Sequence, residues 1–211
     1  NGYTQLFLFG SPKAFASRDC LLENHGHVQI HDFYYYRRTG FIPKDYNVFW
    51  GMEDKKLYEA AKMELETLSQ NSPFFLGFLT VDTHFPKGFC CEDCKPTNDN
   101  SEFAQLKTAI RCSDNQLNSF VEWCKLQSWY ENTTIVITGD HLFMTSSSKT
   151  NIFDEVKFEY DPSKTSRKDA LRIIRRWIYL IINPATEPEN NRNKLRQFTS
   201  FDVFPTTLEA M

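Results

Sequence analysis

The chain has 211 residues, with 24 Lys and Arg against 27 Asp and Glu, which gives a formal net charge of −3. This length suffices for one domain with a sizeable core, and the nearly balanced charge gives no reason to expect nucleic acid as a partner. Nineteen Phe and nine Tyr residues favour a well-filled core with deep pockets over a disordered chain.

Two features of the chain concern membranes and processing. The longest apolar runs, Phe74–Val81 and Trp177–Ile182, are far shorter than the roughly 20 residues that cross a bilayer, so we expect no membrane-spanning segment. The N-terminus carries no signal-peptide pattern. Because the chain starts at Asn1 without an initiator Met and enters a core-like segment at once, we interpret it as a piece excised from a longer protein.

Apolar patterning predicts alternating strands and helices in the first half of the chain. The expected elements are a strand at Tyr3–Phe9, a short helix at Phe15–Asn24, a long aromatic connection at His31–Trp50 and a helix at Asp54–Gln70. Residues at helical spacing predict the buried face of the last helix, namely Leu57, Ala61, Leu65 and Leu68.

The alternation continues in the second half. The expected elements are a strand at Phe74–Val81, a helix at Ser101–Ser128, a strand at Thr133–Thr138, a strand at Trp177–Ile182 and a helix at Ser200–Met211. Phe74–Val81 is apolar without alternation, as in a strand that is covered on both faces. The pattern predicts an α/β fold with a mostly parallel central sheet and helices on both faces, and we treat residues 1–211 as a single portion of one domain.

The six cysteines admit several interpretations. They can pair fully in fifteen ways, and the sequence alone does not choose among them: Cys20, Cys90, Cys91, Cys94, Cys112 and Cys124. Three of them lie in a polar loop that is typical of an exposed disulfide, and Cys112 is the natural partner for one of the three. The alternative is a zinc knuckle of Cys91, Cys94 and Cys112, although a fourth ligand at the usual spacing is missing. A disulfide would indicate an oxidising, extracytoplasmic location.

Polar residues follow two of the predicted strands. Asp82-Thr83-His84 comes after Val81, and Gly139-Asp140-His141 comes after Thr138. In parallel sheets ligands bind at the carboxyl ends of the strands. A carboxylate oxygen beside an imidazole nitrogen suits a divalent metal ion, so Asp140 and His141 are candidate ligands. The alternative is that Asp140 caps the next segment and His141 is an ordinary polar loop residue.

Six segments carry a resemblance to a known family. "NTTIVITGDH" (132–141), preceded by "CSDNQLNSF" (112–120), resembles the C-terminal half of membrane-anchored phosphoglycerol transferases and lipoteichoic acid synthases. These enzymes form part of the sulfatase branch of the alkaline phosphatase superfamily. Further similar segments occur in the family's order: "FGSPKAFASRD" (9–19), "FWGMEDKKLYEAA" (49–61), "FLTVDTHFPKGF" (78–89) and "FTSFDVFPTTLEAM" (198–211). The cysteines in "HFPKGFCCEDC" favour the periplasmic-glucan phosphoglycerol transferases.

The resemblance implies an alkaline phosphatase-like fold and a role for four residues. Asp140 and His141 fall where the family holds its divalent metal, most often Mn²⁺, with Mg²⁺ or Zn²⁺ as the other options. Arg18 falls where a basic residue grips the glycerophosphate, and His84 falls where a histidine contacts the substrate. From the sequence alone, Arg18 could instead form a surface ion pair with Asp19, and His84 could be a buried structural histidine.

The family also implies what the parent protein does. A Thr or Ser nucleophile displaces diacylglycerol from a phosphatidylglycerol-type lipid, and a glycan acceptor then takes the phosphoglycerol group. That nucleophile and a Glu metal ligand belong to the N-terminal half of the domain, which would precede Asn1, so we expect this chain to be inactive alone. The parent would be anchored in a bacterial membrane with this portion on the extracytoplasmic side. The alternatives are a sulfatase or phosphoethanolamine transferase of the same superfamily, a non-catalytic module that binds glycans or lipid headgroups, and a metal-binding protein built on the cysteine loop.

Overall fold

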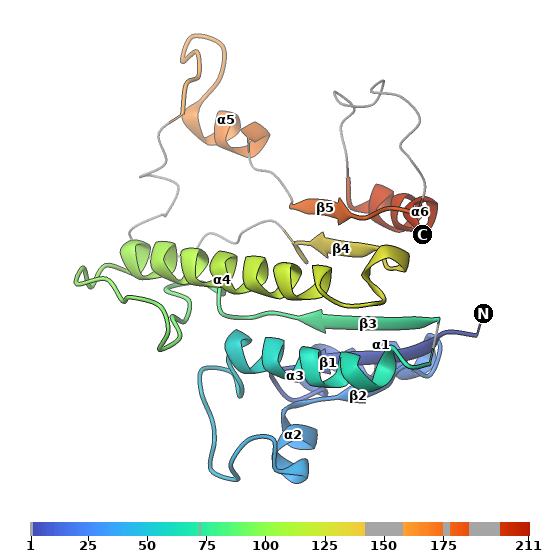
Figure 1. Cartoon of the computed structure of the whole chain (residues 1–211). Coiled ribbons are helices and arrows are strands. Elements are labelled where there is room, and N and C mark those ends of the chain that lie inside the picture. Colours follow the sequence, from blue (N-terminus) through green and yellow to red (C-terminus); the bar gives the residue numbers. More distant parts are fainter. Residues whose placement is uncertain (1, 72, 142–157, 175–177, 186–198) are drawn as a thin grey trace. The chain divides into compact units, whose positions relative to one another are not determined.

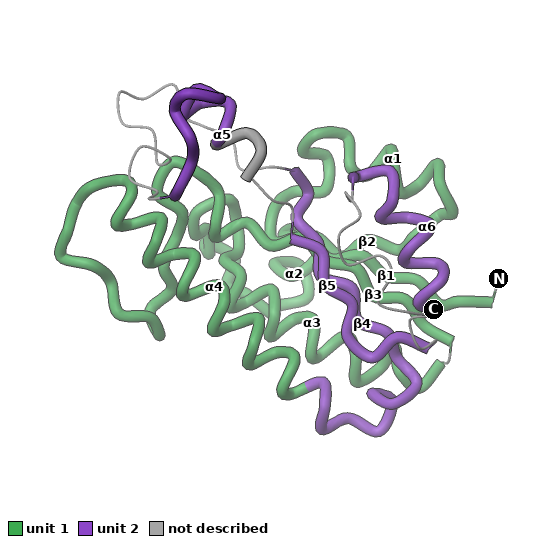
Figure 2. The backbone as a smooth tube through the Cα atoms, turned by 90° about the horizontal axis from the view of Figure 1, so that it is seen from above, with its two compact units in different colours: residues 1–123 green, residues 124–211 purple. Residues whose placement is uncertain are grey.

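The computed structural model describes the chain except for residues 1, 72, 142–157, 175–177 and 186–198. For residues 171–174 it describes the backbone alone. The chain divides into two compact units, residues 1–123 and residues 124–211, which Figure 2 draws in separate colours. Each unit is described by itself. The prediction that residues 1–211 form a single portion of one domain stays a prediction.

The first unit is built on a parallel sheet of three strands (Figure 1). The strands are β1 (Thr4–Phe9), β2 (Gln29–His31) and β3 (Phe74–Leu79), in the order β2-β1-β3. The register pairs Leu6 of β1 with residues on both neighbours, and β1 pairs with β3 over its whole length. The carboxyl ends of all three strands therefore lie at one edge of the sheet, as expected for a parallel α/β fold.

Helices supply the rest of this unit. They are α1 (Arg18–Asn24), preceded by the 3₁₀ turn η1 (Phe15–Ser17), α2 (Phe33–Thr39), α3 (Asp54–Leu68) and α4 (Glu102–Lys125), whose last two residues belong to the second unit. Helix α3 packs against β1 and β3 with the predicted face, because Leu57, Ala61, Leu65 and Leu68 are all buried. In α4, Leu106, Ala109 and Phe120 are buried, whereas Ile110 is 44% exposed.

The second unit contains β4 (Ile135–Thr138), β5 (Tyr179–Ile182), α5 (Arg167–Ile174), α6 (Ser200–Ala210) and the 3₁₀ turn η2 (Tyr130–Asn132). Strands β4 and β5 pair antiparallel, so the parallel arrangement holds for the first unit and not for this one. The predicted strand at Trp177–Ile182 is observed as β5, while Trp177 lies outside the described residues. Helix α6 is fastened to this sheet by a hydrogen bond of 2.9 Å between the hydroxyls of Tyr179 and Thr207.

Two predictions of local structure were wrong. The segment His31–Trp50 is not one long connection, because it begins within β2 and contains α2. Helix α2 has ordinary end signals: the Asp32 carboxylate accepts a hydrogen bond from the Tyr35 amide at 2.9 Å, and Gly40 ends the helix at a φ of +81°. Strand β3 is not covered on both faces along its length, because Phe75 is 43% exposed.

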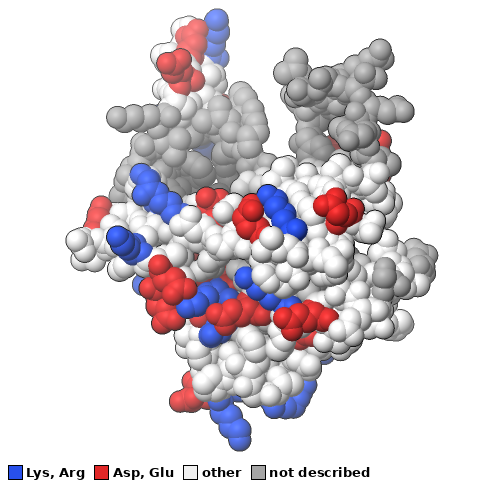
Figure 3. Space-filling model, viewed as in Figure 1, with Lys and Arg blue, Asp and Glu red and all other residues white. Residues whose placement is uncertain are grey.

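None of the helices in the described ranges is both long enough and apolar enough to cross a membrane. On the face shown in Figure 3, Lys and Arg side chains lie among Asp and Glu side chains.

Candidate functional site

Arg18 is held at the start of α1 by hydrogen bonds to neutral groups. Its guanidinium donates to the Ser11 hydroxyl at 2.7 Å and to the carbonyl oxygens of Pro12 and Phe15 at 2.9 Å each. The guanidinium carbon also lies 4.2 Å from the centre of the Phe9 ring, a cation–π contact. These contacts fix the side chain's direction while leaving its charge available for an anion.

Arg18 does not form the alternative surface ion pair with Asp19. Asp19 accepts a hydrogen bond from the Cys20 amide at 2.8 Å, and no carboxylate of the described residues lies within ion-pair distance of Arg18. Burial lowers the pKa of Arg18, which stays a permanent cation at physiological pH. A fixed, unneutralised guanidinium is a suitable group for binding phosphate oxygens.

His84 lies just beyond the end of β3 and is half-buried. Its Nδ1 lies 2.7 Å from the carbonyl oxygen of Phe85, which can only accept, so in the neutral ring the proton is on Nδ1 and Nε2 keeps its lone pair. The ring packs on Trp50, with 4.3 Å between centroids, and on Phe85 at 4.8 Å. His84 is therefore oriented by its neighbours and not enclosed as a core residue.

A chain of aromatic contacts brings Arg18 and His84 to the same edge of the sheet. The Arg18 guanidinium lies 5.3 Å from the Phe15 ring, Phe15 packs edge-on against Trp50 at 5.3 Å, and Trp50 packs against His84 at 4.3 Å. The first pair of predicted site residues therefore comes together through Phe15 and Trp50. Both aromatic residues are in segments that resemble the family, but their contact joins positions 35 residues apart and was not predicted.

Two buried carboxylates lock the start of α3 to the end of β3. Asp54 accepts hydrogen bonds from the amides of Val81 and Asp82, at 2.7 and 3.0 Å, and Asp82 accepts one from the Asp54 amide at 3.1 Å. Both side chains are almost completely buried. Burial, followed by the charge of Asp54, raises the pKa of Asp82 to about 8, and burial raises the pKa of Asp54 to about 6. This pair fixes the position of His84, two residues along the chain.

Asp140 and His141 follow β4 in the second unit and form the other pair of predicted site residues. Their side chains are 62% and 53% exposed, and His141 Nε2 lies 3.6 Å from an Asp140 carboxylate oxygen. The other carboxylate oxygen accepts a hydrogen bond from the His141 amide at 2.9 Å. One carboxylate oxygen and one imidazole nitrogen therefore converge at a spacing that fits two ligands of one divalent ion. The donor set suits Mn²⁺ or Zn²⁺, and the resemblance supplies the expectation of metal at these residues.

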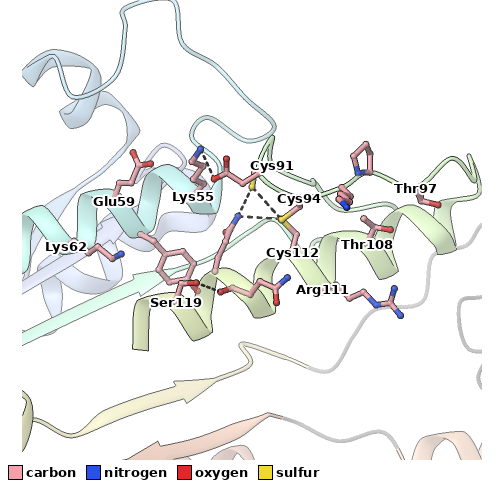
Figure 4. Close-up of a pocket in the computed structure, with 16 residues that line it drawn as sticks. Lys55, Glu59, Lys62, Cys91, Cys94, Thr97, Thr108, Arg111, Cys112 and Ser119 are labelled. Carbon is pink, nitrogen blue, oxygen red and sulfur yellow. Dashed lines mark hydrogen bonds and ion pairs between the residues drawn. A yellow bond between two sulfur atoms is a disulfide. The ribbon is translucent and has the colours of Figure 1, made fainter. Parts of the chain in front are cut away.

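The cysteine loop contains the predicted disulfide. Cys94 and Cys112 are bonded, with 5.7 Å between their Cα atoms, and the other four cysteines form no disulfide: Cys20, Cys90, Cys91 and Cys124. The zinc alternative is contradicted, because two of its three sulfurs are bonded to each other. The Cys91 sulfur nevertheless stays close, 3.5 Å from the Cys112 sulfur (Figure 4).

A pocket of about 840 Å³ lies beside this disulfide. Its walls come from α3, the cysteine loop and α4, with Lys55, Glu59 and Lys62 on the α3 side and Thr108, Arg111 and Ser119 on α4 (Figure 4). Lys55 forms ion pairs with Glu92 at 2.9 Å and Asp93 at 2.8 Å, which tie the loop to α3. The pocket is lined by neither Arg18 nor His84, so it is separate from the first pair of site residues.

Comparison with known proteins assigns the chain to a family. The sulfatase family model matches residues 1–211, so the chain belongs to the sulfatase family. Solved structures agree: a protein of the alkaline phosphatase superfamily from Vibrio parahaemolyticus is 26% identical, with a TM-score of 0.57 over 70% of this chain and 35% of that chain. The lipoteichoic acid synthase LtaP from Listeria monocytogenes shares the fold, with 18% identity and a TM-score of 0.59 over 74% of this chain and 36% of that one.

Curated relatives narrow the comparison. Phosphoglycerol transferase I of Xanthomonas axonopodis pv. citri (strain 306) is 35% identical over 146 residues, which are 68% of this chain and 21% of the relative. Phosphoglycerol transferase I of Escherichia coli (strain 55989 / EAEC) is 31% identical over 151 residues, which are 70% of this chain and 20% of the relative. The chain thus spans about a fifth of the length of these relatives. The predicted family and fold class are confirmed, and proteins of this superfamily generally use divalent metal ions.

Proposed function

We propose that this chain takes part in the metal-dependent transfer of phosphoglycerol from a phosphatidylglycerol-type lipid to a glycan or polymer acceptor, as a portion of a longer enzyme. One observation carries the proposal: at the carboxyl edge of a parallel sheet, an Arg18 guanidinium without a carboxylate within ion-pair distance is connected through Phe15 and Trp50 to an oriented His84. Its relatives named phosphoglycerol transferase I make glycerophosphate the first ligand to test.

Arg18 binds the phosphate group in this proposal. The contacts to Ser11, Pro12 and Phe15 use Nε and Nη2, so the two N–H groups of Nη1 donate to phosphate oxygens, and the charge of the guanidinium offsets theirs. Because Ser11 and the neighbouring carbonyl groups hold the side chain in place, little conformational entropy is lost on binding. His84 Nε2, with its lone pair available, accepts a hydrogen bond from a glycerol hydroxyl or exchanges a proton with the reacting group.

Asp140 and His141 hold a divalent ion, with Mn²⁺ the preferred ion and Mg²⁺ or Zn²⁺ the others. When bound, the ion neutralises charge on the phosphoryl oxygens and lowers the pKa of a hydroxyl nucleophile. The resemblance assigns that Thr or Ser nucleophile and a Glu ligand to the N-terminal half of the family's domain, so the role proposed for this chain is to bind the ion and the phosphate group. The Cys94–Cys112 disulfide supports an extracytoplasmic site of action, and the resemblance supports a bacterial cell envelope and a membrane-anchored parent.

Calorimetry with sn-glycerol 1-phosphate tests the substrate side. We expect Arg18→Gln to weaken binding by about tenfold or more, since a charge-assisted hydrogen bond is lost. Arg38→Gln is the matched control, because Arg38 is an exposed arginine on α2. A simple sulfate ester serves as a second ligand. Tighter binding of glycerol 1-phosphate than of the sulfate ester favours phosphoglycerol transfer, and the reverse order favours a sulfatase. Equal binding by the Arg18→Gln variant and the original chain contradicts the proposed role of Arg18.

Titration with Mn²⁺ tests the metal side by itself. We expect the double variant Asp140→Ala, His141→Ala to lose the binding that the original chain has. Equal Mn²⁺ binding by both proteins would remove Asp140 and His141 from the metal site. Glycerol 1-phosphate binding that needs no metal and is unchanged in the double variant would favour a non-catalytic headgroup-binding module.

A further inference from the structure

A tight turn beside His84 presents two large aromatic residues. The Val48 amide donates a hydrogen bond to the Gly51 carbonyl oxygen at 2.8 Å, and the Gly51 amide donates one to the Val48 carbonyl oxygen at 3.0 Å. Phe49 and Trp50 therefore form the tip of the turn. Phe49 has a φ of +57°, the left-handed region, which a bulky side chain rarely adopts. Hairpin turns prefer glycine at such a position. Phe49 therefore keeps its ring at this place in spite of an unfavourable backbone conformation, which is typical of functional sites.

The turn is fixed firmly to the end of β1. The Met52 amide donates to the Gly10 carbonyl at 2.7 Å, and a Cβ atom on Gly51 would lie 2.6 Å from that same oxygen. A Cβ atom on Gly10 would lie 2.4 Å from the Met52 oxygen. Only glycine allows the two main chains to approach this closely. The aromatic tip is thus held rigidly with respect to the sheet edge that carries Arg18 and His84.

The rings at this edge form a continuous surface around His84. Phe49 packs on Trp50 at 6.1 Å and on Phe89 at 5.8 Å, while Trp50 and Phe85 pack on His84. Phe49 is 36% exposed, and Trp50, Phe85 and Phe89 are half-buried. We call Phe49, Trp50, Phe85 and Phe89 the aromatic platform. Apolar rings that stay partly exposed next to a candidate site indicate a binding surface.

We infer that the aromatic platform binds a pyranose ring of the glycan acceptor, an inference that rests on the proposed function. The face of a neutral aromatic ring carries partial negative charge, which attracts the axial C–H groups of a pyranose. The hydroxyls of the sugar then point outward to polar neighbours. The transferred group must meet an acceptor hydroxyl within reach of its phosphorus. A sugar on the platform has that hydroxyl beside His84, at the same edge of the sheet as the phosphate group that Arg18 is proposed to bind.

The platform fits a sugar better than an acyl chain. The polar His84 side chain lies between two of its rings, Trp50 and Phe85, and Phe15 connects Trp50 to the charged Arg18. A site for an acyl chain is instead lined continuously by apolar groups. The rings are not coplanar, because Trp50 is inclined by 35° to Phe49 and by 48° to the neighbouring His84, so the surface offers separate ring faces.

The test is a titration with a β-linked glucose tetrasaccharide, in which tryptophan fluorescence and NMR report binding. We expect Phe49→Gly and Trp50→Ala each to weaken binding by about five- to tenfold, and Trp50→Phe to keep most of it. Phe49→Gly suits the left-handed backbone, so the variant folds and its melting temperature is equal or higher. Phe201→Ala, which removes an aromatic ring that is 91% exposed on α6, is the matched control and leaves binding unchanged.

The result that would overturn the inference is equal tetrasaccharide binding by Phe49→Gly, Trp50→Ala and the original chain, or no tetrasaccharide binding by the original chain. It would also be overturned if dihexanoyl phosphatidylglycerol bound better than glycerol 1-phosphate through an interaction that Phe49→Gly removes, since the platform would then hold acyl chains. The proposed function fails separately, when Arg18→Gln leaves glycerol 1-phosphate binding unchanged. Phe49→Gly is expected to keep that binding.

Discussion

The buried carboxylate of Asp82 predicts an unusual dependence of stability on pH. Burial raises the pKa of Asp82 to about 8 in the folded protein, against an ordinary value of 3.8. Between these two pH values the Asp82 carboxyl is protonated in the folded protein and ionised in the unfolded chain. The folded state thus binds more protons, so its stability falls as pH rises and levels off above about pH 8. One proton corresponds to about 1.4 kcal/mol per pH unit, and because Asp82 is half deprotonated by about pH 8, the loss of stability between pH 6 and pH 8 is about 2 kcal/mol.

Asp82→Asn isolates this contribution. The amide oxygen can still accept the hydrogen bond from the Asp54 amide, but the side chain no longer titrates. We expect urea denaturation at pH 6, 7 and 8 to show a free energy of unfolding that falls less steeply in the variant than in the original chain. Asp114→Asn, on an exposed part of α4, should leave the slope unchanged. Identical slopes for the Asp82 variant and the original chain would refute the idea that Asp82 is held protonated.

Three further predictions concern covalent and main-chain constraints. Alkylation of the denatured, unreduced chain should modify four cysteines, and mass spectrometry after reduction should count six; six without reduction would contradict the disulfide. Cys112→Ser should lower the free energy of unfolding by about 3 kcal/mol, because the disulfide closes a loop with a sequence separation of 18; denaturation under non-reducing conditions measures this, and no loss would argue against the bond. Gly51→Ala should cost more than about 1 kcal/mol in the same assay, because φ is +139° and the new Cβ would meet the Gly10 oxygen; unchanged stability would contradict that close approach.

Sequence patterns predicted elements whose signals are local. The apolar face of α3 and the polar residues that follow β3 and β4 were found in this way, because helical spacing and strand ends are visible within a few residues. Helix α2 was missed although Asp32 and Gly40 mark its ends. Its run of aromatic residues is equally compatible with a strand or a loop, and this hid the end signals.

The remaining features of the site depend on contacts between distant positions. Asp54 and Asp82 are 28 residues apart, and neither has a neighbour in the sequence that reveals a shared set of hydrogen bonds. The contact of Phe15 with Trp50 likewise exists only after β1 and the Phe49–Trp50 turn have docked. For the same reason, sequence reasoning named Arg18 and His84 from a resemblance and gave no account of the rings that lie between them.

Among the contacts that attach the loop of residues 90–95 to the rest of the first unit, two are chemically different. On the α4 side the attachment is the Cys94–Cys112 bond, and on the α3 side it is the pair of ion contacts from Lys55 to Glu92 and Asp93. Thiol reductants cleave the first attachment and leave the second, while high ionic strength weakens the second and leaves the first. The wall of the pocket beside the disulfide is therefore expected to loosen more under reducing conditions at high ionic strength than under either condition alone.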